Sequence, residues 1–360
     1  MREIKISKNE AGQRLNKFLM KYLKSAPSSF VYKMLRKKNI KLNDAKAEGS
    51  ELLCEGDNIK LFLSDETIDK FKNEISSYTK SSDKRTFNRK KSVENRKINL
   101  DILYIDDDIM AVNKPVGILS QKANEDDYSI NEAIIDYVIQ MQILDETSLD
   151  TFKPSVCNRL DRNTSGIIWA GISLKGSQEL TKAFKERKID KYYYTIVHGR
   201  FNDMLTCDGY IIRDENSLKS EVISEEEYER IRIKEGFDTS KTNKNDFNKQ
   251  GFVRISTSFI PVSTGKEYTL LKIKLITGKT HQIRAHLAKL GYPVIGDVKY
   301  GDRDVNSYMK ERYGLKNHLL HAGEAFWKEK NISLYSEAPE IFEKICKGEG
   351  FIWQPGTPEA

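Results

Sequence analysis

The spacing of apolar residues divides the chain into a short amino-terminal unit and a much larger body. In the unit, apolar residues recur at the spacing of one helical face and predict a helix, at Leu15, Phe18, Leu19 and Tyr22. Ser28 and Ser29 then mark the start of a second helix. Alternating residues predict two short strands over 40–43 and 58–63. We therefore expect residues 1–63 to form a small separate α/β domain.

In the body, over residues 99–347, short apolar runs predict most of the elements. Runs rich in β-branched and aromatic residues predict strands at 102–105, 109–113, 166–171, 191–199, 253–260 and 268–276. Helical spacing predicts helices over 174–188 and 281–290, and Gly291 ends the second. The core stripe of that helix consists of Ile283, Leu287 and Leu290. Arg284 is therefore expected to lie outside the stripe.

Three segments lack the apolar residues that a core needs. Residues 64–98 are polar and basic, and we expect them to form a flexible linker between two domains. Residues 213–250 have mixed charge and predict a polar insertion with a helical start and a loose end. Residues 348–360 are expected to form a carboxy-terminal tail.

Positive charge is concentrated in the first quarter of the chain. Residues 1–63 contain 14 Lys and Arg against 7 Asp and Glu, and residues 64–98 contain 10 against 6. The whole chain has a net charge of +7, yet residues 99–360 contain 36 basic against 40 acidic residues. A basic module joined to a near-neutral body indicates one domain that docks on a polyanion and a second that carries out chemistry.

The cysteines and the apolar runs indicate the compartment. Cys54, Cys157, Cys207 and Cys346 lie far apart in the chain, which is typical of free thiols in a reducing cytoplasm rather than of disulfides or a zinc site. No run approaches the ~20 apolar residues of a membrane helix, and the first residues show no apolar signal region. We expect a cytoplasmic protein with no membrane segment and no metal site.

The most informative motif is NRLDRNTSG over residues 158–166, in which Asp161 lies between Arg159 and Arg162. A nearby guanidinium group favours the ionised form of a carboxyl group, and guanidinium groups also bind phosphate. An ionised acid beside phosphate-binding groups suits chemistry on the sugar of a nucleotide. Taken alone, the motif is equally compatible with an Asx turn in which Asp161 caps its own backbone.

The amino-terminal unit resembles the RNA-binding domain named after small-subunit ribosomal protein four. The matching patterns are Arg-Leu-x-x-Phe-Leu from residue 14, Ser-x-x-Tyr-x-x-Leu-Arg from residue 29, Ile-x-Leu-Asn from residue 40 and Glu-Gly-Asp-x-Ile from residue 55. The resemblance implies binding of structured RNA, and the basic residues expected to contact it are Arg14, Lys33, Arg36, Lys37 and Lys38. The same residues are also compatible with an ordinary solvated helix face.

Four further motifs, in this order, resemble the RNA pseudouridine synthases of the large ribosomal-subunit type. They are NKPVG at 113–117, RLDRNTSG at 159–166, KYY at 191–193 and GKTHQIRAHL at 278–287. With the amino-terminal unit, the chain looks most like the branch that modifies large-subunit ribosomal RNA. The resemblance implies an α+β protein with a mixed, largely antiparallel catalytic sheet. It also implies ribosomal RNA as the partner, no cofactor and no obligate protein partner.

The resemblance further implies roles for individual residues. Asp161 matches the aspartate required for isomerising uridine, and whether it forms a covalent adduct or removes a sugar proton stays open. Tyr193 matches the tyrosine that packs on the base and is placed to help remove the proton of carbon 5. Arg284 matches the arginine that pairs with this aspartate. Arg159 matches the arginine that displaces the target base, and Arg162 is expected to bind RNA beside it.

Two positions depart from the family pattern, and three other functions stay open. Asn158 and Gln121 stand where histidine is common, which removes groups that titrate near neutral pH. The protein could bind ribosomal RNA as an assembly factor without catalysis, or it could modify transfer RNA. A glycosidase or base-excising enzyme would also attack a sugar bond, but no second carboxylate accompanies Asp161 in its motif.

Overall fold

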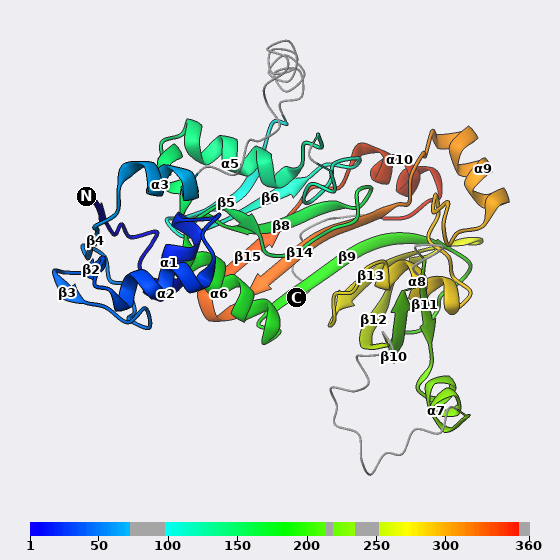
Figure 1. The fold of residues 1–360 in the computed structure, drawn as a ribbon. Coiled ribbons are helices and arrows are strands. Elements are labelled where there is room, and N and C mark those ends of the chain that lie inside the picture. The colour runs from blue at the N-terminus through cyan, green and yellow to red at the C-terminus, as the bar shows by residue number, and fades with distance from the viewer. Residues whose placement is uncertain (73–97, 125, 214–218, 235–251, 353–360) are drawn as a thin grey trace, which may run out of the picture.

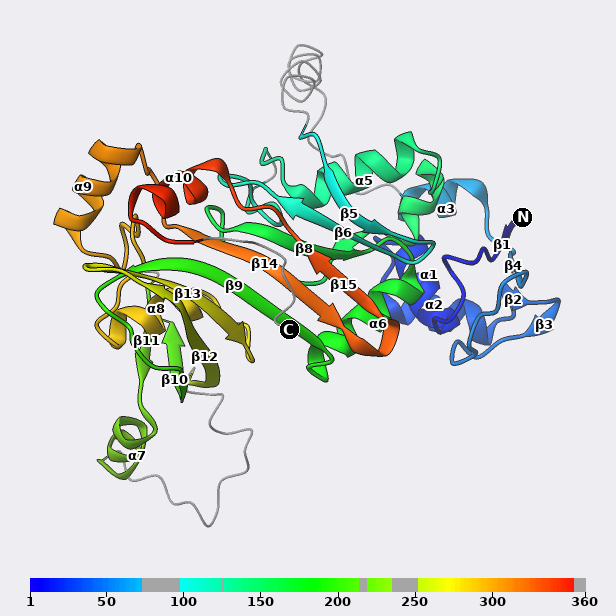
Figure 2. The same cartoon turned by 180° about the vertical axis from the view of Figure 1, so that it is seen from behind.

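The computed structural model describes residues 1–72, 98–124, 126–213, 219–234 and 252–352. The described residues form an elongated molecule, with a small amino-terminal unit at one end and a long sheet through the rest (Figure 1). The reverse view shows the same arrangement, with the amino-terminal helices beside one end of the long sheet (Figure 2). The described residues therefore form two sheets, and helices pack against each of them.

Antiparallel strands and short helices make up residues 1–72. The helices are α1 (Leu15–Tyr22), α2 (Ser28–Arg36) and α3 (Asp65–Lys72). The strands have the order β1 (Arg2–Lys5), β4 (Asn58–Leu61), β2 (Ile40–Leu42) and β3 (Ala45–Lys46), and neighbouring strands are antiparallel. The predicted apolar face of the first helix is confirmed, because all four of its residues are buried in one core.

Helix α3 lies inside the segment that composition assigned to a flexible linker. Ile68 on α3 is fully buried in the amino-terminal core, and Phe71 packs against that core. Arg2 also lies 3.3 Å from both Asp65 and Asp69. The prediction of a linker from residue 64 is therefore wrong for this helix, because two apolar residues are enough to dock it. Residues 73–97, the rest of the predicted linker, lie outside the described residues.

The large sheet is mixed and mostly antiparallel. Its main strands are β5 (Asp101–Ile105), β6 (Ile109–Lys114), β8 (Ser165–Gly171), β9 (Ile189–His198), β10 (Leu205–Arg213), β11 (Ser220–Ile223), β12 (Val253–Thr264), β13 (Tyr268–Leu275) and β14 (Leu320–Trp327). They have the order β11-β10-β12-β13-β9-β14-β8-β6-β5. The short strands β7 (Ser155–Val156) and β15 (Ile332–Tyr335) pair with β8 and β14. Among the described strands only β14 and β8 pair in parallel, which confirms the predicted sheet of an α+β protein.

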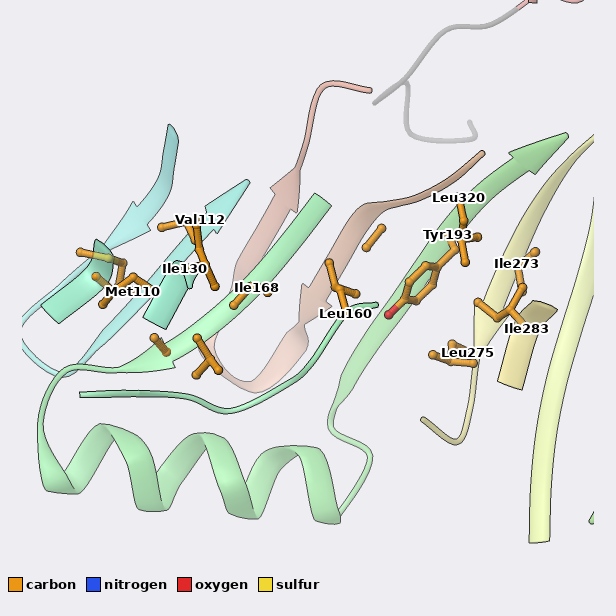
Figure 3. Close-up of a cluster of buried hydrophobic side chains, with 14 of the residues drawn as sticks. Met110, Val112, Ile130, Leu160, Ile168, Tyr193, Ile273, Leu275, Ile283 and Leu320 are labelled. Atoms are coloured by element: carbon orange, nitrogen blue, oxygen red, sulfur yellow. The ribbon is translucent and has the colours of Figure 1, made fainter. Parts of the chain in front are cut away.

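Successive side chains of a strand point to opposite faces of the sheet, and strand β6 contributes to an apolar core on each face. Met110 of β6 lies in a core with residues of helix α5 (Ile130–Gln140). Its neighbour Ile109 lies in a different core, with residues of helix α6 (Leu174–Lys185). The core on the α5 side extends along the sheet past Tyr193 to Ile273 and Leu275 of β13 (Figure 3).

The remaining helices of the described residues are α7 (Glu225–Lys234), α8 (Gln282–Lys289), α9 (Arg303–Tyr313) and α10 (Glu340–Gly348), with short 3-10 turns η1 (Glu146–Asp150) and η3 (Lys328–Lys330). Of these helices, α9 and α10 share a core with residues of the central strands β9 and β13, and α7 and α8 lie near β10 and β11 (Figure 1). The predicted helices over 174–188 and 281–290 correspond to α6 and α8, and Gly291 follows α8 with φ 83°. In the part of the chain that the structure describes, none of the helices is both long and apolar enough to cross a membrane.

The predicted polar insertion at 213–250 begins with strand β11 rather than with a helix. Helix α7 follows this strand, and the ring of Tyr228 on α7 stacks on Tyr210 of β10 at 3.8 Å between centroids. The expected loose end at 235–250 and residues 353–360 of the expected tail lie outside the described residues. The prediction of a tail from residue 348 is wrong at its start, because Phe351 is buried in the core with residues of α9 and α10.

The amino-terminal unit contacts the body around η1. The Thr151 hydroxyl donates a buried hydrogen bond of 2.6 Å to the Glu10 carboxylate. Asp150 lies 3.6 Å from Lys24 and 3.4 Å from Lys72. These contacts hold the unit against the side of the large sheet that carries α5 (Figure 1).

The close contact between β8 and β14 requires a glycine. Gly166 has φ 111°, and a Cβ atom there would lie 2.2 Å from the carbonyl oxygen of Ala322. Gly166→Ala is therefore expected to lower the free energy of unfolding by about 3 kcal/mol or more, because it adds both backbone strain and a clash with backbone. Chemical denaturation measures this loss.

Gly291→Ala is the matched control. Gly291 has φ 83°, but an added Cβ atom there meets nothing within 4 Å. We expect this variant to lose only about 1 kcal/mol, from backbone strain alone. Equal losses in the two variants would show that the β8–β14 contact does not require glycine.

Candidate active site

The loop that carries Asp161 lies between β7 and β8 and is fixed on both sides of this residue. The N–H of Leu160 donates to Ser120 Oγ at 3.0 Å, and that hydroxyl donates back to the Leu160 carbonyl at 2.8 Å. After Asp161, the N–H of Thr164 donates to the Asp161 carbonyl at 3.1 Å. The Thr164 hydroxyl is also hydrogen-bonded to His318 Nε2 at 2.9 Å. The backbone carbonyl closes this turn, so the Asp161 carboxylate is left for other partners.

Lys114, at the end of β6, ties the same loop to the rest of the sheet. Its side chain is fully buried, and its ammonium donates to the carbonyls of Pro115, Ile118 and Arg162 at 2.9, 2.9 and 3.0 Å. The N–H of Gly117 donates to the same Arg162 carbonyl at 2.9 Å. The NKPVG motif therefore acts as a support for the Asp161 loop.

Arg284 on α8 joins Asp161 to a second carboxylate. Its Nη1 donates to Asp161 Oδ2 at 2.8 Å, while its Nε and Nη2 donate to the two oxygens of Asp297 at 2.6 and 2.9 Å. The side chain of Arg284 is 7% exposed and that of Asp297 is 0% exposed, whereas that of Asp161 is 25% exposed. Asp297 therefore holds the guanidinium group, which presents its remaining edge to Asp161.

The prediction that Arg284 lies outside the apolar stripe of its helix is confirmed. Ile283 and Leu287 do lie in the main core, and Arg284 is off their side of the helix. Arg284 is nevertheless buried, because Asp297 from a separate loop supplies the paired carboxylate that a buried guanidinium requires. Helical periodicity within 281–290 contains no information about that loop.

The charges of this network stabilise one another. Burial alone would raise the pKa of the Asp297 carboxyl, but the hydrogen bonds and charge of Arg284 bring that pKa below its usual value. Burial also opposes the charge of Arg284, yet Asp297 and Asp161 together raise the pKa of its guanidinium. His281 Nε2 lies 3.8 Å from Asp161 Oδ2, and burial lowers the pKa of this histidine. The buried arginine and aspartate are therefore both ionised at neutral pH.

Tyr193 comes from the middle of β9 and lies beside the Asp161 loop. Its ring is buried between Leu160 and Leu275 (Figure 3). Burial, and then the negative charge of Asp161, raise the pKa of the Tyr193 hydroxyl, so it stays protonated at neutral pH. The side chain offers an apolar ring and one polar group next to a carboxylate.

A cleft of ≈ 970 Å³ collects the site residues predicted in the body. Its lining includes Arg159, Asp161, Arg162, Tyr193 and Arg284. The five predicted RNA-binding residues of the amino-terminal unit, Arg14, Lys33, Arg36, Lys37 and Lys38, are exposed but do not line this cleft. Among the described residues, no group of three or more His, Cys, Asp or Glu is arranged to hold a metal ion. The structure therefore brings the predicted site residues of the body together in one cleft, whereas the predicted RNA-binding residues of the amino-terminal unit lie outside it.

Other residues that shape the site were not found from the sequence. Asp297 and His318 lie in loops with no periodic pattern, and only their place in space reveals their contacts with Arg284 and Thr164. Asn158 stands where histidine is common, and here it accepts from the Trp169 N–H at 2.7 Å and donates to a β8 carbonyl at 3.2 Å. An amide provides both bonds, so this position needs no titratable group.

Residues 108–289 match the family model described as RNA pseudouridylate synthase, which spans half of the chain. A ribosomal large subunit pseudouridine synthase C from Rickettsia bellii is 28% identical over 333 residues, covering 92% of this chain and 96% of that protein. An uncharacterized RNA pseudouridine synthase from Mycoplasma capricolum is 30% identical over 312 residues, covering 84% and 85%. The solved structure of human RNA pseudouridylate synthase domain containing 4 has the same fold, with 17% identity and a TM-score of 0.52 over 76% of this chain and 100% of that one.

The chain belongs to the RNA pseudouridylate synthase family. It is an RNA pseudouridine synthase, an enzyme that isomerises uridine within RNA. The family predicted from the four motifs of the body is thereby confirmed. The resemblance of the amino-terminal unit to a ribosomal-protein-type RNA-binding domain stays a prediction.

Buried histidines around the site are expected to make stability depend on pH. Burial lowers the pKa of His286, His318 and His321 to about 4 each, against about 6.5 in an unfolded chain. The unfolded state therefore binds more protons below pH ~6.5, and stability is lost as the pH falls from there toward ~4. At about pH 5 each histidine is expected to cost about 2 kcal/mol relative to neutral pH, as measured by chemical denaturation.

His321→Gln isolates one of these contributions. His321 Nε2 donates to the Ser336 carbonyl at 2.9 Å, and Nδ1 lies 2.9 Å from the Ser165 hydroxyl. Glutamine keeps hydrogen-bonding capacity without a titrating ring. The drop in stability between about pH 7 and pH 5 should be about 2 kcal/mol smaller in this variant than in the wild type. An identical drop would contradict the assignment.

Proposed function

We propose that this enzyme converts specific uridines of large-subunit ribosomal RNA to pseudouridine, with Asp161 as the essential carboxylate. The observation that carries the proposal is the network in which buried Asp297 fixes Arg284 and Arg284 fixes Asp161 at the cleft. Relatives over nearly the whole length of the chain are named as large-subunit pseudouridine synthases, which supports the choice of RNA. The cytoplasm, where ribosomal RNA is accessible to such an enzyme, is the proposed location.

The reaction exchanges one bond for another without a net change in composition. The bond from the ribose to the uracil nitrogen breaks, the uracil turns within the cleft, and a bond forms from the ribose to carbon 5. The proton of carbon 5 leaves, and the released nitrogen gains a proton. Asp161 acts at the ribose during these steps, because Arg284 directs an ionised carboxylate into the cleft.

Tyr193 and the two exposed arginines handle the base. The buried ring of Tyr193, which lines the cleft, provides a surface on which uracil packs, and its hydroxyl is the group proposed to help remove the proton of carbon 5. Burial raises the pKa of that hydroxyl, so the hydroxyl is protonated at neutral pH. It can therefore accept the proton of carbon 5 only while it gives up its own proton. The target base must leave its stack, which costs a few kcal/mol. Arg159 occupies the vacated space, and Arg162 binds phosphate beside it.

The amino-terminal unit is proposed as the docking domain for structured RNA. Its five candidate residues are exposed, and they belong to the α1 start and to α2 with its following turn. Basic residues on a rigid helical face bind the phosphates of folded RNA with little dependence on sequence. Affinity therefore comes largely from this unit, and chemistry comes from the cleft.

Asp161→Asn separates catalysis from binding. The amide keeps the shape of the side chain but removes the negative charge, so conversion should fall by roughly 10³-fold or more. Affinity for the same RNA should change little, because phosphate contacts dominate binding. The measurement is conversion of large-subunit ribosomal RNA transcripts, read by mass spectrometry, with filter binding on the same samples.

Three outcomes would oppose this proposal. Retained conversion by the Asn variant would remove Asp161 from the mechanism. Release of free uracil would indicate base excision, since an isomerase conserves the mass of its RNA. If the protein binds ribosomal RNA but converts uridines only in transfer RNA, then transfer RNA is the substrate.

Neutralising the basic face of α2 is expected to weaken docking. The triple variant Lys33→Gln, Arg36→Gln, Lys37→Gln removes three exposed charges. Each lost phosphate contact should reduce the slope of log affinity against log salt by about 0.7, giving about 2 in total. Titrations at several salt concentrations measure this slope.

A triple variant at the other end of the molecule controls for net charge. Lys310→Gln, Lys316→Gln and Lys347→Gln also remove three exposed charges, but they lie on and near α9 and α10 (Figure 1). This control variant should keep most of the wild-type slope of log affinity against log salt. If both triples lower it equally, the amino-terminal unit is not the docking surface.

A further inference from the structure

A side cavity opens next to the active-site cleft and shares part of its lining. Its volume is ≈ 360 Å³, and Phe184, Arg187 and Lys191 line both the cavity and the cleft. Two hydroxyl groups, of Thr206 and Ser258, lie in the cavity wall and are hydrogen-bonded to each other at 2.9 Å. A space of this size suits a small polar or aromatic group that enters from the cleft.

Lys191 is the residue of the KYY motif that the proposed mechanism does not use. It lies two residues before Tyr193 on β9, so both side chains point to the same face, about 7 Å apart along the strand. Its Nζ lies 5.6 Å from the centroid of the Phe184 ring and 3.7 Å from the position of a Cβ at Gly278. The ammonium is therefore held at the junction of the cavity and the cleft.

Lys191 makes no ion pair, because no carboxylate of the described residues lies within ion-pair distance of it. Its sequence neighbour Asp190, which also lines the cavity, pairs with Lys274 at 2.9 Å and only partly offsets the effect of burial on Lys191. Burial, and then the positive charge of Arg187, lower the pKa of Lys191. Two positive charges at the edge of a cleft repel each other, and an anion bound between them stabilises the charged form of both.

Arg187 is placed to be the second ligand of that anion. It is exposed in the turn between α6 and β9, in a left-handed conformation with φ 58° that non-glycine residues seldom adopt. This conformation ends helix α6, where the N–H of Lys188 donates to the Ala183 carbonyl at 2.9 Å, and it fixes the backbone at Arg187. Its guanidinium group can bind two oxygens of one phosphate, while an ammonium binds as a point charge.

We propose that Lys191 and Arg187 bind the RNA backbone phosphate that flanks the target uridine, with the adjoining nucleotide at the mouth of the side cavity. This inference rests on the proposed function, because it takes the base on Tyr193 to be the target uridine. It assigns the lysine of the KYY motif a substrate-positioning role that is separate from the chemistry at Asp161. The bound phosphate fixes the register of the strand, so that one uridine and not its neighbour lies over Tyr193.

A charge-neutralisation cycle tests this assignment. The probes are synthetic RNA stem-loops built around a uridine that the enzyme converts, each with one methylphosphonate linkage either before or after that uridine. Every probe, including the charged reference, carries a 2′-O-methyl group on the nucleotide that precedes the altered linkage. For the wild type, one of the two neutral linkages should lower affinity about tenfold, the expected effect of losing a charge-assisted phosphate contact.

The variants Lys191→Gln and Arg187→Gln should each be less sensitive to that same linkage, because each keeps only one of the two cations that bind the phosphate. Neutralising the linkage should cost each variant about threefold or less, against about tenfold in the wild type. Lys182→Gln, an exposed lysine of α6 that lines neither the cavity nor the cleft, should keep the full tenfold loss. Arg187 is exposed, so its variant preserves the test if Lys191→Gln does not fold.

Equal losses in the wild type and in both variants, at either linkage, would overturn the inference. Conversion of the unmodified stem-loop by the wild type is read in parallel. A failure of the proposed function therefore shows as unconverted uridine, whereas a failure of the inference shows as equal binding losses with conversion intact.

Discussion

The pairing of one buried arginine with two carboxylates is the interaction on which the site depends. Removing a guanidinium group from water is costly, and a buried charge that lacks a partner strongly destabilises a fold. Asp297 offsets this cost, because it takes two N–H groups of Arg284 and is itself fixed by the backbone N–H groups of Lys299 and Tyr300 at 2.9 and 3.1 Å. The third donor of the arginine then points in one direction, toward Asp161. A carboxylate on a loop thereby becomes a fixed charge in the cleft.

The large sheet brings these groups together from distant parts of the chain. Strand β14 lies between β8 and β9, so the loop that precedes β8 and the middle of β9 meet on one face. That contact is close enough to require Gly166, which places the Asp161 loop against β14. Lys114 fixes the other side of the loop through backbone carbonyls alone. The geometry of the proposed site is therefore a product of strand order, and the loop that carries Asp161 is held mainly through its backbone.

Part of this fold and site could be predicted from the sequence, and the missed parts have more than one cause. Apolar periodicity locates α1, α6 and α8, and the motifs identify Asp161, Tyr193 and Arg284 as members of one site, because these signals are local. Asp297 is missed because a single aspartate after Gly296 has no pattern of its own, and its partner lies on another element.

Helix α3 and strands β1 and β3 are missed because they are short and depend on tertiary contacts. Strands β10 and β14 are missed because glycine and polar residues interrupt their apolar positions. Helix α5 is not predicted either, although its buried residues follow helical spacing.

Asp161 is proposed as the carboxylate with which this protein isomerises uridines of large-subunit ribosomal RNA. The most direct test is a pseudouridine map of that RNA from cells that lack the protein, complemented with the wild type or with Asp161→Asn. The account predicts that specific sites disappear in the deletion strain, return with the wild type and stay absent with the variant. A map that is unchanged by the deletion, or restored equally by the variant, would contradict it.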